Sequence, residues 1–364
     1  MMTKRQRFLA AMRREPTDGK LVWAPNFDYW LNINRAQGTL PEAYRDMSRN
    51  DIVRSIDATI WNRAGGLSWQ QDPSIKHTFG THANGVHFHE ISTPIGSIYQ
   101  ENAPTESEHS SQACIKHFVT DIDSLRVMIY VAEGTQATVD FSDAFKALEE
   151  TGDDGIVLHM IFCVPLIQFA KSDAGYTNAF YLMADYPEEV DRLIKAYHKN
   201  FVEGYRLLSA TPADALAFGD NMDELMISPK LFERYAVEFY QECKEVSKGS
   251  GKIMEAHWCG RTQHLLPLAA KAGLDVLEAV ITEPMADITL EAALDILDGK
   301  VALQGGIPSV LVCPNITPQR DFESYIEKVI LKQKVRTGFI LGMGDNVPPD
   351  ADFARIEMIA EMIK

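Results

Sequence analysis

The second half of the sequence alternates between short apolar segments and longer amphipathic segments, and this alternation constrains the fold most strongly. Apolar segments with the character of strands recur at intervals of roughly 25 to 40 residues, each followed by a helical pattern. They are 155–158, 215–218, 252–257, 275–277, 301–303 and 338–341. Segments 21–23 and 58–61 add two earlier strands and bring the expected number to eight. Because parallel strands need helical crossovers, the sequence predicts an α/β fold, a (β/α)8 TIM barrel.

The helical patterns fill the intervals between these strands. They are 165–184, 187–208, 229–247, 262–272, 290–297, 319–333 and a closing segment from 352. An open, doubly wound sheet is the alternative arrangement of such units. It is disfavoured because no phosphate-binding glycine fingerprint follows an early strand.

The N-terminal half departs from the alternation at about residues 76–118. Within it, 86–99 alternates in polarity and carries turn residues at Ser92, Pro94 and Gly96. This pattern predicts a β-hairpin or small antiparallel sheet, inserted over one mouth of the barrel. The sequence has no evident repeat or linker, so residues 1–364 are expected to form one domain.

Composition limits the partners of such a barrel. Acidic residues outnumber basic ones by 51 to 35, which gives a net charge of −16. This excess disfavours binding to nucleic acid and anionic membranes, because it repels phosphates. No apolar run is long enough to span a bilayer, and the N-terminus is too polar for a signal peptide. Five scattered cysteines favour a reducing cytoplasm over a disulfide framework.

The strand at 252–257 and the residues after it offer the clearest chemistry. Alternation along an extended chain places Glu255, His257 and Cys259 on one face, opposite Met254, Ala256 and Trp258. Polar groups of this kind are costly to bury without a partner, and zinc accepts sulfur, nitrogen and oxygen ligands. Barrel active sites lie at the C-terminal ends of strands. A metal site is therefore predicted here, with a core histidine and a structural cysteine as the alternative.

A second polar cluster follows the strand at 215–218. Asp220, Asn221 and Asp223 come directly after it, and Ser228 stands before Pro229 as the expected cap of the next helix. We expect Asp220 or Asp223 to act as a general acid or base, or to hold a cationic group. Asn221 and Ser228 are expected to bind substrate, whereas a solvated turn is the alternative.

The third cluster follows the strand at 338–341. Gly342 and Gly344 allow a ligand to approach the backbone, while Asp345 and Asn346 offer polar contacts. Met343, Asp345 and Asn346 are therefore further candidates for substrate binding. Cys313, beyond the strand at 301–303, could turn toward the same mouth.

Taken together, these segments resemble the uroporphyrinogen decarboxylase superfamily, which includes decarboxylases and cobalamin-dependent methyltransferases. The resemblance covers nearly the whole chain. It is carried by segments 219–221, 227–232, 257–260, 273–277, 301–307, 342–344 and 348–350. The resemblance implies the (β/α)8 fold of that superfamily.

The N-terminal region and the His257/Cys259 pair point to the methyltransferase branch. Decarboxylases of the haem pathway carry an arginine-rich segment that clamps a substrate with many carboxylates, whereas this chain has the aromatic, acid-bearing segment 23–30. The resemblance therefore implies methyl transfer between a small substrate and a corrinoid cofactor held by a partner protein, with zinc at His257 and Cys259. A methoxylated aromatic, a methylamine or a thiol is the expected substrate. The alternative is a carboxy-lyase that works without metal.

The third zinc ligand is where this sequence departs from the family. Zinc methyltransferases of the superfamily take a cysteine from the Gly-x-Gly turn, and this chain has Met343 there. A thioether is a poor zinc ligand, so the third ligand is expected from elsewhere or the metal is absent. The candidates for it are Glu255, Cys313, Asp345 and Glu278.

Overall fold

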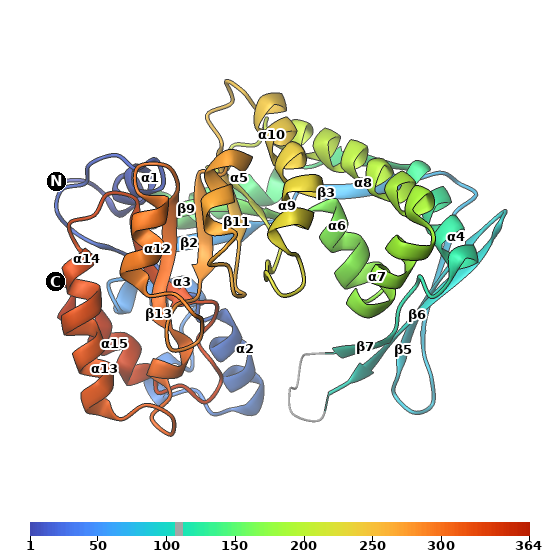
Figure 1. Cartoon of the computed structure of the whole chain (residues 1–364). Helices are drawn as coiled ribbons and strands as arrows, with labels where there is room; N and C mark the ends of the chain where they lie inside the picture. The colour runs from blue at the N-terminus through green and yellow to red at the C-terminus, as the bar shows by residue number, and fades with distance from the viewer. Residues whose placement is uncertain (106–111) are drawn as a thin grey trace.

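A curled, parallel sheet of eight strands forms the centre of the molecule (Figure 1). The computed structural model describes residues 1–105 and 112–364. The strands of this sheet are β1 (Val22–Trp23), β2 (Ile60–Ala64), β9 (Gly155–Ile161), β10 (Ala215–Phe218), β11 (Ile253–His257), β12 (Val276–Val280), β13 (Ala302–Pro308) and β14 (Phe339–Gly344). Their spatial order, β1-β14-β13-β12-β11-β10-β9-β2, follows the order of a (β/α)8 barrel. The backbone N–H of Thr59 donates to the carbonyl of Trp23 at 2.6 Å and joins the two edges.

The predicted strand–helix alternation is confirmed as a parallel α/β sheet, with differences at the strand ends. The strand predicted at 215–218 has the observed bounds of β10. In contrast, β13 and β14 continue past their apolar segments through Gly305, Gly306 and Gly342, and they pair in register from Leu303 opposite Phe339. These glycines extend the ladder because backbone hydrogen bonds require no apolar side chain.

Helices cover the outside of this sheet and one of its ends. The helices before β9 are α1 (Lys4–Met12), α2 (Asp28–Gln37), α3 (Arg49–Ser55), α4 (Ile122–Glu133) and α5 (Ser142–Thr151), with short 3-10 turns η1 (Glu42–Tyr44) and η2 (Gly152–Asp154). After β9 come α6 (Pro165–Ile167), the π-helical η3 (Gln168–Asp173), α7 (Tyr176–Asp185), α8 (Pro187–Leu208), α9 (Pro229–Tyr235), α10 (Val237–Val246), α11 (Leu266–Ala272), α12 (Leu290–Leu297), the 3-10 turn η4 (Ser309–Val312), α13 (Gln319–Tyr325), the π-helical η5 (Ile326–Ile330), α14 (Leu331–Gln333) and α15 (Phe353–Met362). None of the described helices has the length and apolar character needed to cross a membrane.

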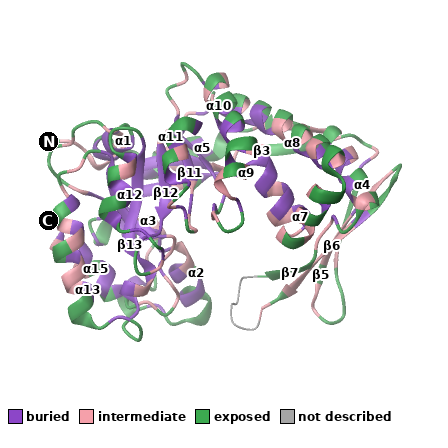
Figure 2. Cartoon of the chain, viewed as in Figure 1, coloured by how far each residue is buried: buried purple, intermediate pink, exposed green. Residues whose placement is uncertain are grey.

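The core is divided by the sheet into an inner and an outer part. Along β11, Ile253 belongs to the inner cluster, whereas Met254 and Ala256 belong to the larger outer cluster beneath the helices. Figure 2 shows the buried strands at the centre of the molecule, with exposed residues on the outer faces of the helices. Phe8 and Met12 of α1 join the inner cluster and fill the N-terminal end of the barrel. Because apolar residues fill the N-terminal end, the inward-facing polar residues of β11 and β12, Glu255, His257 and Glu278, lie toward the C-terminal end.

Between β2 and β9 the chain forms two antiparallel sheets. One pairs β3 (Leu67–Gln71) with β8 (Thr135–Val139). The other joins β4 (Lys76–Thr81), β5 (His87–Thr93), β6 (Gly96–Pro104) and β7 (Gln112–Lys116) and packs on α4 (Figure 1). The sequence predicted antiparallel structure in this region. Its placement over the barrel mouth stays a prediction.

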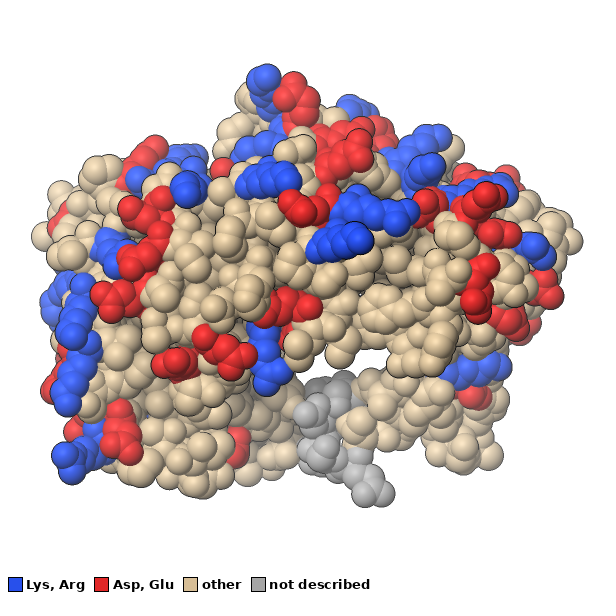
Figure 3. All heavy atoms as spheres, in the orientation of Figure 1, with Lys and Arg blue, Asp and Glu red and all other residues tan. Residues whose placement is uncertain are grey.

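Charged side chains of both signs are interspersed on the face drawn in Figure 3. They gather over α8 and α10, and the area beneath them is mostly uncharged. A mixed surface of this kind lacks the continuous basic stripe that follows a nucleic-acid backbone. The face drawn in Figure 3 therefore offers no continuous basic surface for phosphates.

Candidate active site at the C-terminal end of the barrel

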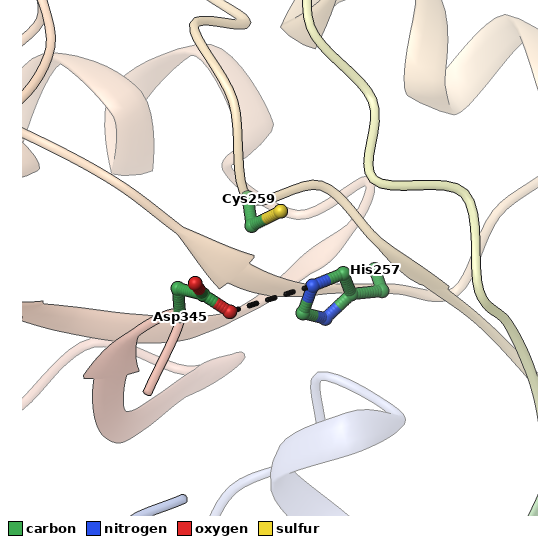
Figure 4. Close-up of side chains that lie close together, drawn as sticks. All are labelled: His257, Cys259 and Asp345. Atoms are coloured by element: carbon green, nitrogen blue, oxygen red, sulfur yellow. Dashed lines mark ion pairs between the residues drawn. The ribbon is translucent and has the colours of Figure 1, made fainter. Parts of the chain in front are cut away.

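Three potential metal ligands converge where β11 and β14 end. His257 is the last residue of β11, Cys259 follows two residues later, and Asp345 comes directly after β14. One donor atom from each lies within 4.8 Å of the other two. In Figure 4, the Cys259 sulfur and the Asp345 carboxylate point toward the imidazole of His257. His257 and Cys259 thus lie on the same side, as predicted, and a carboxylate oxygen of Asp345 joins their nitrogen and sulfur donors.

The imidazole of His257 is held between two carboxylates. Its Nδ1 forms a hydrogen bond with Oε2 of Glu278 on the adjacent strand β12, and its Nε2 lies 3.6 Å from Oδ1 of Asp345. Burial alone would lower the pKa of His257, but the charge of Glu278 and the contacts with Cys259 outweigh it and raise that pKa well above its ordinary value. The neighbouring carboxylates therefore favour a positive charge on this side of the mouth, whether a proton or another cation.

Asp345 reaches the site through an unusual backbone turn. Its φ is 79°, in the left-handed region that non-glycine residues seldom adopt. Asn346 donates from Nδ2 to Oδ1 of Asp345 at 2.8 Å, and Ser309 donates to the carbonyls of Gly344 and Asn346. Burial raises the pKa of Asp345, an effect that the charge of His257 opposes. The turn and its hydrogen bonds together direct the carboxylate toward His257.

Met343 occupies a different environment from Asp345. Its side chain is buried in the outer hydrophobic cluster with Leu341, whereas Ile340 of the same strand lies in the inner cluster. The polar donor is therefore Asp345, directly after the Gly-x-Gly turn and two residues after the position where the family's third ligand is expected. The substrate-binding role expected of Met343 stays a prediction.

The loops after β10 and β11 are fastened together beside Cys259. The backbone N–H of Gly260 donates to the carbonyl of Met222 at 2.9 Å, and Asp223 accepts from the N–H groups of Arg261 and Leu225. A Cβ on Gly260 would lie 2.5 Å from the Met222 carbonyl and from Cβ of Asp223. Oδ2 of Asp223 thus holds the loop that carries Cys259, while Oδ1 braces the loop of Asp223 itself.

Asp220 lies deeper than the mouth. It is fully buried, and its oxygens accept from the N–H of Val164 at 2.9 Å and from the hydroxyl of Tyr240. Burial raises its pKa to about 6, against the lowering effect of these hydrogen bonds. The carboxylate therefore bridges the end of β10 to the start of α6 and to α10, and its two oxygens already have partners.

Glu255 and Cys313 stand apart from the three converging donors. Among the described residues, both oxygens of Glu255 lack a hydrogen-bond partner, and burial together with the charge of Glu278 raises its pKa to about 8. Glu255 lies one inward-facing position below His257 on β11. The thiol of Cys313 instead forms hydrogen bonds with the carbonyl of Ser309 and the carboxylate of Asp350. Within the described residues, the candidate metal group contains neither of them.

The other predicted substrate-binding residues have separate placements. Asn221 is exposed and has a φ of 51°. Ser228 caps α9, as predicted, because its hydroxyl accepts from the N–H of Leu231. The substrate-binding role expected of Asn221 and Ser228 stays a prediction.

Arg63 is a charged residue of the mouth that the sequence did not single out. It lies on β2, its guanidinium sits 4.7 Å from the ring centroid of Trp61, and it approaches Asp28 at 3.6 Å. Its positive charge opposes part of the rise that burial causes in the pKa values of Glu255 and Asp345. The predicted strand ended at residue 61, and its alternation continued by two residues would have placed Arg63 on the inner face.

Comparison with known proteins identifies the family of this barrel. The family model described as uroporphyrinogen decarboxylase (URO-D) matches residues 167–364, which include every strand from β10 to β14 and all three converging donors. The chain belongs to the uroporphyrinogen decarboxylase family. The family resemblance expected from the sequence is therefore confirmed.

Solved structures show how far the fold of this family member is shared. A methyltransferase from Methanosarcina mazei superposes with a TM-score of 0.61 at 12% identity, over 100% of this chain and 98% of that one. A GH18 chitinase from Pseudoalteromonas aurantia gives a TM-score of 0.33 at 13% identity, over 62% of this chain and 82% of that one. No curated protein matches the sequence. At such identities the likeness to the methyltransferase concerns the fold.

Proposed function

We propose that the chain is a methyltransferase that moves a methyl group between a small substrate and a corrinoid carried by a partner protein. The family assignment and the full-length likeness to the Methanosarcina mazei methyltransferase support the class. The observation that carries the proposal is the convergence of His257, Cys259 and Asp345 at the C-terminal end of the sheet. Among the four candidates for the third ligand, this convergence supports Asp345 in place of the cysteine expected from the Gly-x-Gly turn.

The donor set of this group fits zinc. One imidazole nitrogen, one thiolate and one carboxylate oxygen are all ordinary zinc ligands. Around a tetrahedral zinc ion, ligand atoms lie roughly 3 to 4 Å from one another, so separations of up to 4.8 Å require only small side-chain shifts. Three protein ligands would leave a fourth position open, as in catalytic zinc sites. Zinc bound there would supply Lewis acidity toward the heteroatom that carries or accepts the methyl group.

The residues of this chain would prepare the site in distinct ways. Glu278 holds Nδ1 of His257, which leaves Nε2 directed toward Asp345 and the open centre of the mouth. This arrangement fixes the ring orientation and raises the basicity of a ligating imidazole. Asp223 positions Cys259 through the backbone of Arg261. We therefore assign Asp223 to positioning, and Asp220 to holding the start of α6 against β10.

The substrate class follows from a charge argument. The methyl group leaves a heteroatom that retains the bonding electron pair and takes a proton, so the departing group must be stabilised as negative charge develops. A zinc ion bound among these donors would offset that charge for a thiol or a phenolic methyl ether, and a methylamine is the third candidate. A carboxy-lyase, the reaction in the family's name, is the second candidate function. It would require cations for a polycarboxylate, and Arg63 already faces Asp28.

A direct assay separates these functions. Purified protein is mixed with cob(I)alamin and, in turn, a methylated thiol, a methoxylated aromatic or a methylamine, and methylcobalamin formation is followed by absorbance. We expect turnover with one class, about one zinc per chain, and loss of both with His257→Ala. His264→Ala is the matched control, since His264 is exposed and bonds to Glu224 on the neighbouring loop.

Two results would count against the proposal. Full activity in protein stripped of metal would reject the role of zinc while leaving methyl transfer intact. Decarboxylation of a carboxylated tetrapyrrole without a corrinoid would favour the lyase instead.

A further inference from the structure

An aromatic pocket is lined by residues of α4, α8 and β3, elements that precede or follow the first strands of the barrel in the chain. Its volume is about 240 Å³. Residues from segments far apart in the sequence line it, including Trp69 of β3, Phe162 after β9, and Tyr197 and Phe201 of α8. Its lining contains none of His257, Cys259 and Asp345. It is therefore a second concave site, distinct from the candidate active site.

The aromatic rings form a connected wall. Phe162 stacks on Phe201 with ring centroids 4.4 Å apart, and Tyr197 stacks on the same Phe201 at 5.4 Å. Trp69 tilts against Phe162 and Phe201 at 6.0 and 5.5 Å. Trp69 is also 38% exposed, although it is a large apolar side chain. Several aromatic rings therefore border one small space, and Trp69 is the exposed one among them.

A buried carboxylate lies at the polar end of this wall. Asp173 is 4% exposed, and it accepts hydrogen bonds from Nε2 of Gln168 at 2.9 Å and from the hydroxyl of Tyr197 at 2.7 Å. Among the described residues that line the pocket there is no Lys, Arg or His. Burial raises the pKa of Asp173 to about 7 because these neutral donors only partly replace water. Buried charges in proteins are ordinarily paired, and this one has no cationic partner in the pocket.

We propose that this pocket binds a small organic cation of the quaternary or methylated ammonium class. Aromatic faces attract cations through the ring quadrupole, and clusters of such faces recognise methylated ammonium groups. The methyl groups of such a cation fit an apolar wall that a bare ammonium would not. Asp173 supplies the opposite charge that the lining otherwise lacks. The proposal rests on the pocket alone and holds whether or not the chain transfers methyl groups.

The test compares two molecules of nearly equal shape. Choline carries a trimethylammonium group, and 3,3-dimethylbutan-1-ol carries a neutral tert-butyl group in its place. Each is titrated into the wild-type protein at pH 8 by calorimetry, with Trp fluorescence as a second readout. We expect choline to bind at least 10-fold more tightly, in line with cation–π and ion-pair contributions in a desolvated site. Equal affinities, or no binding of choline at 10 mM, would overturn the proposal.

Variants locate the binding site. Trp69→Leu and Asp173→Asn should each weaken choline binding about 10-fold or more and leave the weak binding of the neutral alcohol nearly unchanged. His257→Ala should bind choline as the wild type does. If His257→Ala abolishes choline binding while Trp69→Leu does not, the cation binds at the barrel mouth and the assignment to this pocket fails. The comparison of the two ligands on wild-type protein decides the cation preference even if Asp173→Asn does not fold.

Discussion

Glu278 and His257 lie side by side on neighbouring strands, and their side chains are hydrogen-bonded. The register of β11 and β12 places the two residues opposite each other at the C-terminal end of the sheet. Glu278 is 1% exposed, so its charge acts on His257 with little screening by solvent. The pair has the form of a carboxylate that orients a metal-binding histidine. If His257 binds zinc, as proposed, Glu278 would orient this ligand and would not itself be the third ligand considered from the sequence.

Replacing Glu278 with Gln should weaken zinc binding without abolishing it. The amide keeps the shape of the side chain and loses the charge, so the expected loss in affinity is about 10- to 100-fold. Competition with a zinc-binding chelator measures it directly. Glu291→Gln, at the exposed first turn of α12, is the control and should bind zinc as the wild type does. An unchanged affinity in Glu278→Gln would separate Glu278 from the metal site.

Met343 in the Gly-x-Gly turn and Asp345 directly after it should respond differently to substitution. Asp345→Asn should lower zinc affinity by about 10-fold or more, because an amide oxygen is a weaker zinc ligand than a carboxylate. Met343→Leu should leave zinc binding unchanged and cost less than about 1.5 kcal/mol of stability, since Met343 lies in the outer core. Chelator competition and denaturant unfolding give the two quantities. The reverse pattern would identify Met343 as the ligand.

Gly260→Ala should disturb the site through the backbone. The added methyl group would meet a carbonyl and a Cβ at 2.5 Å, so the two loops beside Cys259 must separate. We expect a loss of about 1 to 3 kcal/mol in unfolding free energy, together with reduced zinc retention. Gly299→Ala is the control for adding a methyl group, because nothing lies within 4 Å of it and only its left-handed backbone is strained. Equal zinc retention in the two variants would argue that the loops are not coupled.

Asp220 should make the protein less stable as the pH rises. Its pKa is about 6 in the folded chain, above the ordinary 3.8. Between these values the folded state holds a proton that the unfolded state releases, so unfolding free energy falls as pH increases from 4 to 6. A shift of this size corresponds to about 3 kcal/mol. Asp220→Asn should lack this part of the decline, whereas the control Asp298→Asn, at an exposed position, should retain it. Urea unfolding at a series of pH values measures both. Parallel pH profiles for the wild type and Asp220→Asn would contradict the assignment.

The sequence predicted the strands best where burial on both faces leaves an unbroken apolar run. Ala215–Phe218 is such a segment, buried throughout and followed by Gly219 and Asp220. Alternation was enough to place His257 and Cys259 toward the interior, since the side-chain period of a strand is fixed. The residues found in this way are those whose position depends on their own strand alone.

Contacts between strands and the irregular turns were harder to foresee. The pairing of His257 with Glu278 depends on the register of two strands separated by a helix, which no local pattern encodes. Asp345 faces the site because of a left-handed backbone angle that aspartate adopts only occasionally. Arg63 was missed because β2 extends beyond residue 61, where the apolar run that predicted this strand ends. The sequence thus predicted the strand end at which His257 and Cys259 meet Asp345, and it left the third donor open among four residues.

The helix α1 has a consequence for the order of events at this site. Phe8 and Met12 fill the N-terminal end of the barrel, so molecules that reach His257 enter from the opposite end. In the proposed reaction a small substrate and a much larger corrinoid protein share that entrance. The larger protein would block the way once docked. If the proposed reaction holds, the barrel would impose an order on its two reactants, in which the small molecule is seated first and leaves after its partner has gone.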